Sequence, residues 1–234
     1  MNLNEFLSKN KIVLEEPVLE FCQEGIGMMK KSIDPFHDEG HVFRILDNLD
    51  VFLGENDEVN KGEIDFEELL ISICWHDAWK SRQFPRHWWS AVYQIFWEGI
   101  GSMRLFTREA KKSNIEKTLI ESIRYNIRKH SRFQFWPTKD LEAKIMKDAD
   151  NLDFWSLERM EIAAREIAKN GWISRPLIQT ARLFISFMML INRSSFYFEW
   201  SKKEAEKRKE IYLEGVKNLV DRCETEYLKR QPPV

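Results

Sequence analysis

Apolar side chains recur along most of the chain at the three- and four-residue spacing that places them on one face of an α-helix. Two clear stripes run from Val42 to Leu53 and from Phe66 to Cys74. No segment shows the strict alternation of apolar and polar residues that is typical of a half-buried strand. The sequence therefore predicts an all-α fold, with helices over about 14–33, 42–53, 66–74, 90–110, 113–127, 138–150, 156–170, 174–193 and 199–228. Ser113 and Glu116 have the spacing of a capping box at the start of the fifth of these helices.

Composition and charge narrow the class of protein. Glycine (9) and proline (7) together make up few of the 234 residues, which favours long helices over tight turns. The 36 basic and 38 acidic residues give a net charge of −2, which argues against nucleic acid as the main partner. A chain of this length can bury one substantial core. We expect a helical core over residues 1–170, with the helices of residues 171–234 packed on it rather than forming an independent domain.

The cysteines and the most apolar stretch bear on where the protein is found. Cys22, Cys74 and Cys223 are odd in number and widely spaced, which indicates unbridged thiols in a reducing compartment. The first residues show no charged-then-apolar signal pattern. The most apolar stretch, Leu183 to Ile191, is too short to span a bilayer. These observations predict a cytoplasmic protein with no membrane partner.

Several polar side chains continue apolar stripes, where burial would be costly unless they were paired or coordinated. His76 and Asp77 follow the stripe that ends at Cys74, and His130 follows a stripe at helical spacing. His41 begins the stripe of its helix, and His37 lies one turn earlier.

A divalent metal ion would account for histidines and carboxylates directed toward a core. Neutral imidazoles and carboxylates suit Mn, Fe, Co, Ni, Zn or Mg, whereas a cysteine-rich structural zinc site would need more thiolates. The sequence therefore predicts a site for one such ion, or for two.

The order of these residues resembles the signature of the HD-domain metal-dependent phosphohydrolases, H…HD…D on a helical bundle. The matching residues are His41, the pair His76 and Asp77, and a late aspartate in the stretch 148–152. The resemblance covers about residues 30–160. It implies an HD-domain helical bundle in which His41, His76, Asp77 and one late aspartate bind the metal.

Two aspartates compete for the last ligand position. Asp148 and Asp150 are two residues apart, or about 200° around a helix, so both cannot face one ion unless the helix ends between them. The apolar stripe of this segment does not decide between them. The family pattern favours Asp150 as the ligand and leaves Asp148 as the alternative. If Asp150 binds the ion, we expect Asp148 to lie behind the ligands without binding it.

The resemblance also implies roles for residues around the metal. Asp77 would orient the attacking water, and Arg44, Lys80 and His130 would stabilise charge on the substrate phosphate. Residues 76–80 match the HDxxK form of the motif, and Arg44 lies three residues after His41. Some relatives bind a second metal through further histidines, and His87 and His130 are the candidates for that role or for a phosphate contact. We expect His37 to lie in the second shell.

The implied activity is metal-dependent hydrolysis of a phosphoester or phosphoanhydride in a nucleotide or another small phosphate-containing substrate. One alternative is a diiron oxygenase of the same fold, for which His87 and His130 would supply further ligands. Another is a non-catalytic module that binds a metal or a nucleotide. The aromatic stretch of residues 174–200 predicts a packed helix pair, with a homodimer surface as the alternative.

Overall fold

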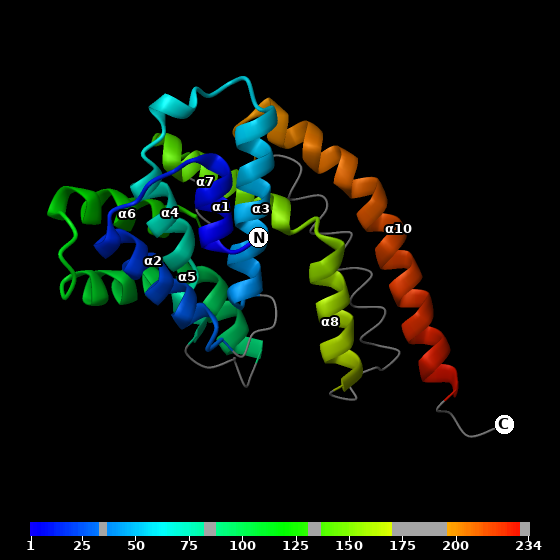
Figure 1. Cartoon of the computed structure of the whole chain (residues 1–234). Helices are drawn as coiled ribbons and strands as arrows, with labels where there is room; N and C mark the ends of the chain where they lie inside the picture. The colour runs from blue at the N-terminus through cyan, green and yellow to red at the C-terminus, as the bar shows by residue number, and fades with distance from the viewer. Residues whose placement is uncertain (33–36, 82–87, 131–136, 170–195, 230–234) are drawn as a thin grey trace. The chain divides into compact units, whose positions relative to one another are not determined.

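The computed structural model describes the chain apart from residues 33–36, 82–87, 131–136, 170–195 and 230–234 (Figure 1). Its secondary structure is entirely helical in the described residues, which confirms the predicted all-α class. The helices are α1 (Leu3–Asn10), α2 (Glu16–Met29), α3 (Glu39–Glu55), α4 (Phe66–Trp75), α5 (Trp88–Ala110), α6 (Lys117–Lys129), α7 (Leu141–Asp153), α8 (Leu157–Lys169) and α10 (Glu199–Lys229), with short 3-10 helices η1 (Lys61–Glu63) and η2 (Ala78–Ser81).

The chain divides into two compact units, Met1–Asp150 and Asn151–Val234. The predicted division into a core of residues 1–170 and a C-terminal layer of residues 171–234 stays a prediction. No helix of the described ranges combines the length and the apolar character that crossing a bilayer requires.

Two helix starts differ from the sequence predictions. Helix α1 was not predicted, yet its capping box is complete: the Asn2 side chain accepts from the Glu5 backbone N–H, and the Glu5 carboxylate accepts from the Asn2 N–H. The capping box expected at Ser113 is absent, and helix α6 begins only at Lys117. The reason is local, because the Ser113 hydroxyl donates to the Ala110 carbonyl in the last turn of α5 instead. The helix predicted over 174–193 lies outside the described residues.

The core of the first unit forms where α2, α4, α5 and α6 pack on one another. Trp75, at the end of α4, is fully buried and stacks on Phe21 of α2 with ring centroids 4.8 Å apart. Its indole N–H donates to the Phe21 carbonyl at 2.9 Å, and Phe106 of α5 meets the same ring edge-on. The end of α4 is therefore fixed from two sides, immediately before the residue pair that the sequence marks as functional.

Helices α2 and α4 approach each other closely because α2 carries a glycine at the contact. A Cβ atom at Gly25 would lie 2.7 Å from the Cys74 carbonyl oxygen and 2.7 Å from the Trp75 indole nitrogen. Only glycine fits this position without a shift of one helix. Cys22 and Cys74 are buried beside this contact as unbridged thiols, as expected from the sequence.

A buried polar network joins α4 to α6. The Asn126 amide donates to the Glu68 carboxylate at 2.7 Å and to the Ser72 hydroxyl at 3.2 Å. Glu68, Ser72 and His76 follow each other at four-residue intervals on α4, and Asn126 and His130 do so on α6. These polar side chains lie on the facing sides of α4 and α6. On both helices they lead to the C-terminal end, where His76 and His130 lie.

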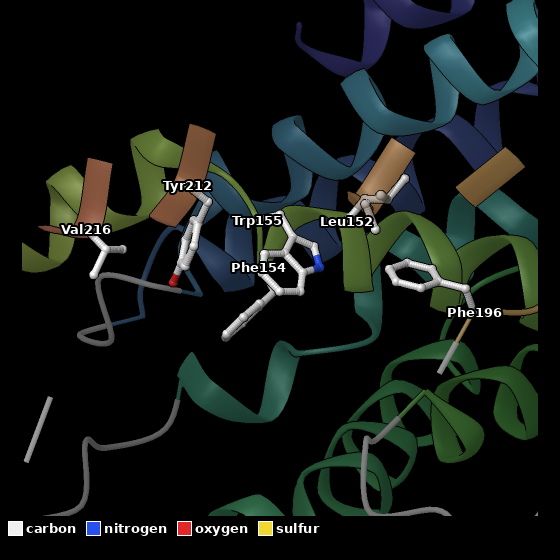
Figure 2. Packing of buried hydrophobic residues seen from close by; sticks show 7 residues of the cluster. Leu152, Phe154, Trp155, Phe196, Tyr212 and Val216 are labelled. Atoms are coloured by element: carbon white, nitrogen blue, oxygen red, sulfur yellow. The ribbon is translucent and has the colours of Figure 1, made fainter. Parts of the chain in front are cut away.

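The second unit has a hydrophobic cluster of its own, built from the end of α7, the residues that follow it, and α10. Figure 2 shows its main side chains, which are Leu152, Phe154, Trp155, Phe196, Tyr212 and Val216. The rings of Trp155 and Tyr212 meet edge-on at 5.4 Å, and α8 packs along α10. Asp153, fully buried, is paired with Arg159 of α8 at 3.0 Å.

Candidate metal centre

The residues singled out by the sequence come together where several helices of the first unit begin or end. His41 lies in the first turn of α3, whose N-cap, Asp38, accepts from the His41 backbone N–H. His76 and His130 occupy the C-cap positions of α4 and α6. Asp150 comes from α7, which α3 holds through an Asn48 amide that donates to the Ala149 carbonyl at 2.9 Å. Cations are stabilised at helix C-termini, so the two C-cap histidines lie where a cation is favoured.

The ring orientation of the two C-cap histidines is set by their own helices. Nδ1 of His76 lies 2.7 Å from the Ile73 carbonyl oxygen, and Nδ1 of His130 lies 2.5 Å from the Ile127 carbonyl oxygen. A carbonyl oxygen only accepts, so each Nδ1 carries the proton. In a neutral ring Nε2 then bears the lone pair, as in a metal ligand whose other nitrogen is held by a backbone carbonyl.

Three buried residues, His41, His76 and Asp150, form a group that could hold a metal ion. Nε2 of His41 lies 3.1 Å from Nε2 of His76 and 3.3 Å from Oδ1 of Asp150. Ligand atoms about 2.1 Å from one ion are about 3.0 to 3.4 Å apart in octahedral or tetrahedral geometry. These two separations fit one shared cation, and all three ligand atoms lie within 4.8 Å of one another. Asp148 is also buried, but it does not belong to this group.

Asp77 is the hub of the surrounding contacts. Its Oδ2 lies 3.5 Å from Nε2 of His76 and 3.7 Å from Nε2 of His41, so it borders the three-residue group. The same oxygen is 3.1 Å from the Lys80 ammonium and 3.7 Å from Nε2 of His37. A cation beside this group would thus have a second carboxylate within reach.

The other oxygen of Asp77 faces His130. Oδ1 of Asp77 and Nε2 of His130 are 3.3 Å apart, and neither atom makes a well-directed hydrogen bond among the described residues. His76 and His130 also meet with their ring planes nearly perpendicular and their centroids 5.1 Å apart. The structure therefore brings His130 to the cluster, next to Oδ1 of Asp77, whereas His41 lies near Oδ2.

Burial and neighbouring charges set the protonation of the cluster. Burial lowers the pKa of His76 to about 4, so this imidazole is neutral at pH 7 and able to bind a metal. Burial alone would raise the pKa of Asp77, but Lys80 and the nearby histidines hold it well below its usual range. Burial would likewise lower the pKa of His130, yet the adjacent Asp77 carboxylate raises it above its ordinary value.

The remaining predicted residues are placed as follows. Arg44 is buried on α3, one turn after His41. His37 lies next to the cluster, with its ring centroid 5.3 Å from that of His41. His87 lies outside the described residues.

One neighbour of the cluster was missed by sequence reasoning. Glu98 of α5 places its carboxylate 3.1 Å from the Lys80 ammonium. In the sequence it is one acidic residue within a long amphipathic helix, and nothing in its spacing distinguishes it from a solvent-exposed residue.

Comparison of the chain with protein-family models, with curated proteins and with solved structures yields no match. A proposal about function therefore depends on the geometry of the cluster.

Proposed function

We propose that this protein is a metal-dependent phosphohydrolase that cleaves a phosphoester or phosphoanhydride bond in a nucleotide or another small phosphate compound. The observation that carries the proposal is the buried group of His41, His76 and Asp150, whose ligand atoms fit a single cation. The order of these residues along the chain, with Asp77 directly after His76, is the order of the HD-domain signature.

The ligand residues would bind the cation from three helices, through the Nε2 atoms of His41 and His76 and a carboxylate oxygen of Asp150. A bound divalent ion would polarise a phosphoryl oxygen and lower the pKa of a water molecule to near neutrality. Asp77, ionised and adjacent to both histidines, is placed to accept a hydrogen bond from that water and orient it.

Positive groups beside the cluster would bind the phosphate. Lys80 contacts Asp77 directly, and Arg44 follows His41 by one turn on α3. A guanidinium suits bidentate contact with a phosphate, and an ammonium acts as a point charge. When protonated, His130 would add a third positive group, next to the other carboxylate oxygen of Asp77. Such groups would stabilise the charge that develops on the phosphoryl oxygens during hydrolysis.

A metal-binding and turnover experiment tests the proposal. The purified protein is stripped with a chelator and reloaded separately with Mn, Co, Ni, Zn, Fe or Mg, and then assayed against nucleoside mono-, di- and triphosphates, cyclic nucleotides and a generic phosphate ester. We expect His76→Ala and Asp150→Asn to weaken metal binding about tenfold to a hundredfold and to abolish turnover. Asp148→Asn is the comparison variant and should weaken metal binding less than Asp150→Asn, because Asp148 lies outside the group. The proposal fails if no divalent ion binds.

The same experiment separates the alternatives. A diiron oxygenase would bind two irons per chain, show the absorption of an iron site under O₂ and turn over no phosphate ester. A non-catalytic module would bind the metal with the same dependence on His76 and Asp150 but give no turnover on any substrate of the panel.

A further inference from the structure

Lys80 is shared between two carboxylates that come from different elements. Its ammonium nitrogen lies 3.1 Å from Oδ2 of Asp77 and 3.1 Å from Oε2 of Glu98. All three side chains are largely withdrawn from solvent, with exposed fractions of 10% for Lys80, 3% for Asp77 and 13% for Glu98. Water screens ion pairs this sheltered only weakly. The position of the Lys80 ammonium between the two carboxylates therefore affects the electrostatic potential at the cluster.

The packing of α5 on η2 holds Glu98 in this position. A Cβ atom at Gly101 would lie 2.3 Å from the Trp79 ring, so α5 approaches η2 as closely as a glycine permits. One residue further along α5, the Ser102 hydroxyl accepts from the Trp79 backbone N–H at 3.2 Å. Glu98, Gly101 and Ser102 are spaced three and four residues apart and therefore share one face of α5. That face is fitted to the segment that carries Lys80.

The ion pair between Glu98 and Lys80 affects the charge next to the cluster. Oδ2 of Asp77 points to the same region as the nitrogens of His41 and His76. If Asp77 were the sole partner of Lys80, the ammonium would neutralise this carboxylate and repel a cation at the cluster. Glu98 supplies a second negative group at the same distance from the Lys80 ammonium, so that only part of the lysine charge is directed at Asp77.

We propose that Glu98 is a positioning residue that draws Lys80 partly away from Asp77 and thereby strengthens divalent-cation binding at the cluster of His41, His76 and Asp150. This inference rests on the metal site of the proposed function and assigns a role to a residue that the signature does not contain. Glu98 is placed to act through Lys80, because its carboxylate contacts the lysine and it does not belong to the group of His41, His76 and Asp150.

Metal affinity measured with and without Lys80 tests the inference. Mn²⁺ and Co²⁺ affinities are measured by calorimetry and by competition with a coloured chelator for the full chain and for Glu98→Gln, Lys80→Met and the double variant. We expect Glu98→Gln to bind about tenfold more weakly, in the range that residues supporting metal ligands show. Lys80→Met should bind more tightly than the wild type, because a positive charge is removed. Relative to Lys80→Met, the double variant should lose less affinity than Glu98→Gln loses relative to the wild type, since the lysine through which Glu98 acts is then absent.

Two further variants guard against a merely structural effect. Glu98→Asp keeps the charge and should restore most of the affinity. Glu109→Gln removes a carboxylate of the same helix that is also paired with a lysine, Lys112, and should leave the affinity unchanged.

The outcomes separate this inference from the proposed function. Glu98→Gln weakening the affinity by the same factor with and without Lys80 would overturn the inference, because Glu98 would then act on the cation directly. An unchanged affinity in Glu98→Gln would overturn it as well. In both cases the metal site itself would stand. Absence of any cation binding by the wild type would instead refute the proposed function together with the inference.

Discussion

Two glycines that lie two residues apart on α2, and so on opposite sides of the helix, should respond in opposite directions to the same substitution. At Gly25 a Cβ atom would lie 2.7 Å from the Cys74 carbonyl oxygen, whereas at Gly27 it would meet nothing within 4 Å. Alanine in place of an unhindered helical glycine gains about 0.5 to 1 kcal/mol. Gly27→Ala should therefore stabilise the first unit by about that amount.

Gly25→Ala gains the same propensity but forces α2 and α4 apart. Ordinary van der Waals contact requires about 3.4 Å or more, so the backbone of one helix must move by roughly 0.7 Å, and overpacking of this kind typically costs about 1 to 3 kcal/mol. Trp75 would also lose alignment of its hydrogen bond to the Phe21 carbonyl, which is worth about 1 kcal/mol. The net expectation is a loss of about 1 to 3 kcal/mol, so the two variants should differ by about 2 to 4 kcal/mol.

The difference can be read from urea denaturation followed by tryptophan fluorescence and by circular dichroism. Because His76 directly follows Trp75, Gly25→Ala should also weaken Mn²⁺ binding, whereas Gly27→Ala should not. If Gly25→Ala were as stable as Gly27→Ala, the close packing of α2 on α4 would be refuted, and with it the view that this contact fixes the end of α4.

Three further predictions concern stabilisation by a bound metal ion, loss of stability at low pH, and the buried polar network between α4 and α6. A divalent ion present at about a hundred times its dissociation constant should add about 2.7 kcal/mol of stability, and a chelator or His76→Ala should remove that gain in a thermal melt. Burial would raise the pKa of Asp50, but hydrogen bonds from Lys9 and Asn10 lower it. The stability that the ionised Asp50 carboxylate contributes is therefore present above its pKa in the unfolded chain, about 4, and is lost as the pH falls through its lower pKa in the folded protein. Asp50→Asn should accordingly lose less stability on acidification than the wild type. Asn126→Ala removes one of the donors to the buried Glu68 carboxylate, with Ser122 remaining, and should cost about 1 kcal/mol in urea denaturation, while an unchanged midpoint would contradict the network.

The all-α class could be predicted because apolar periodicity and scarce glycine and proline report directly on helices. The residues that meet at the cluster could be singled out because polar side chains that end apolar stripes must find partners inside. His76 and His130 are both of this kind, and the structure brings them together. The choice between Asp148 and Asp150 could not be made from periodicity, since it depends on how α7 is rotated against α3.

Other features depend on contacts that leave no local trace in the sequence. The role of Glu98 depends on the approach of α5 to η2, which is set by Gly101 and Trp79. The capping box at Ser113 does not form because α6 begins only at Lys117, and the Ser113 hydroxyl instead donates to the Ala110 carbonyl at the end of the preceding helix. Helix α1 was missed because its eight residues carry only three buried apolar positions, Leu3, Phe6 and Leu7, which give little periodic signal.

The cluster takes its histidines from helix ends and none from a helix middle. Residues can therefore be added or removed at the far ends of α4 and α6 without turning the imidazoles. A single residue inserted in the last turn of α4 would instead rotate His76 by about 100° and direct its ring at the hydrophobic core. Insertions and deletions at the N-terminal ends of α4 and α6 should accordingly leave metal binding unchanged, whereas those in the last turn of either helix should abolish it.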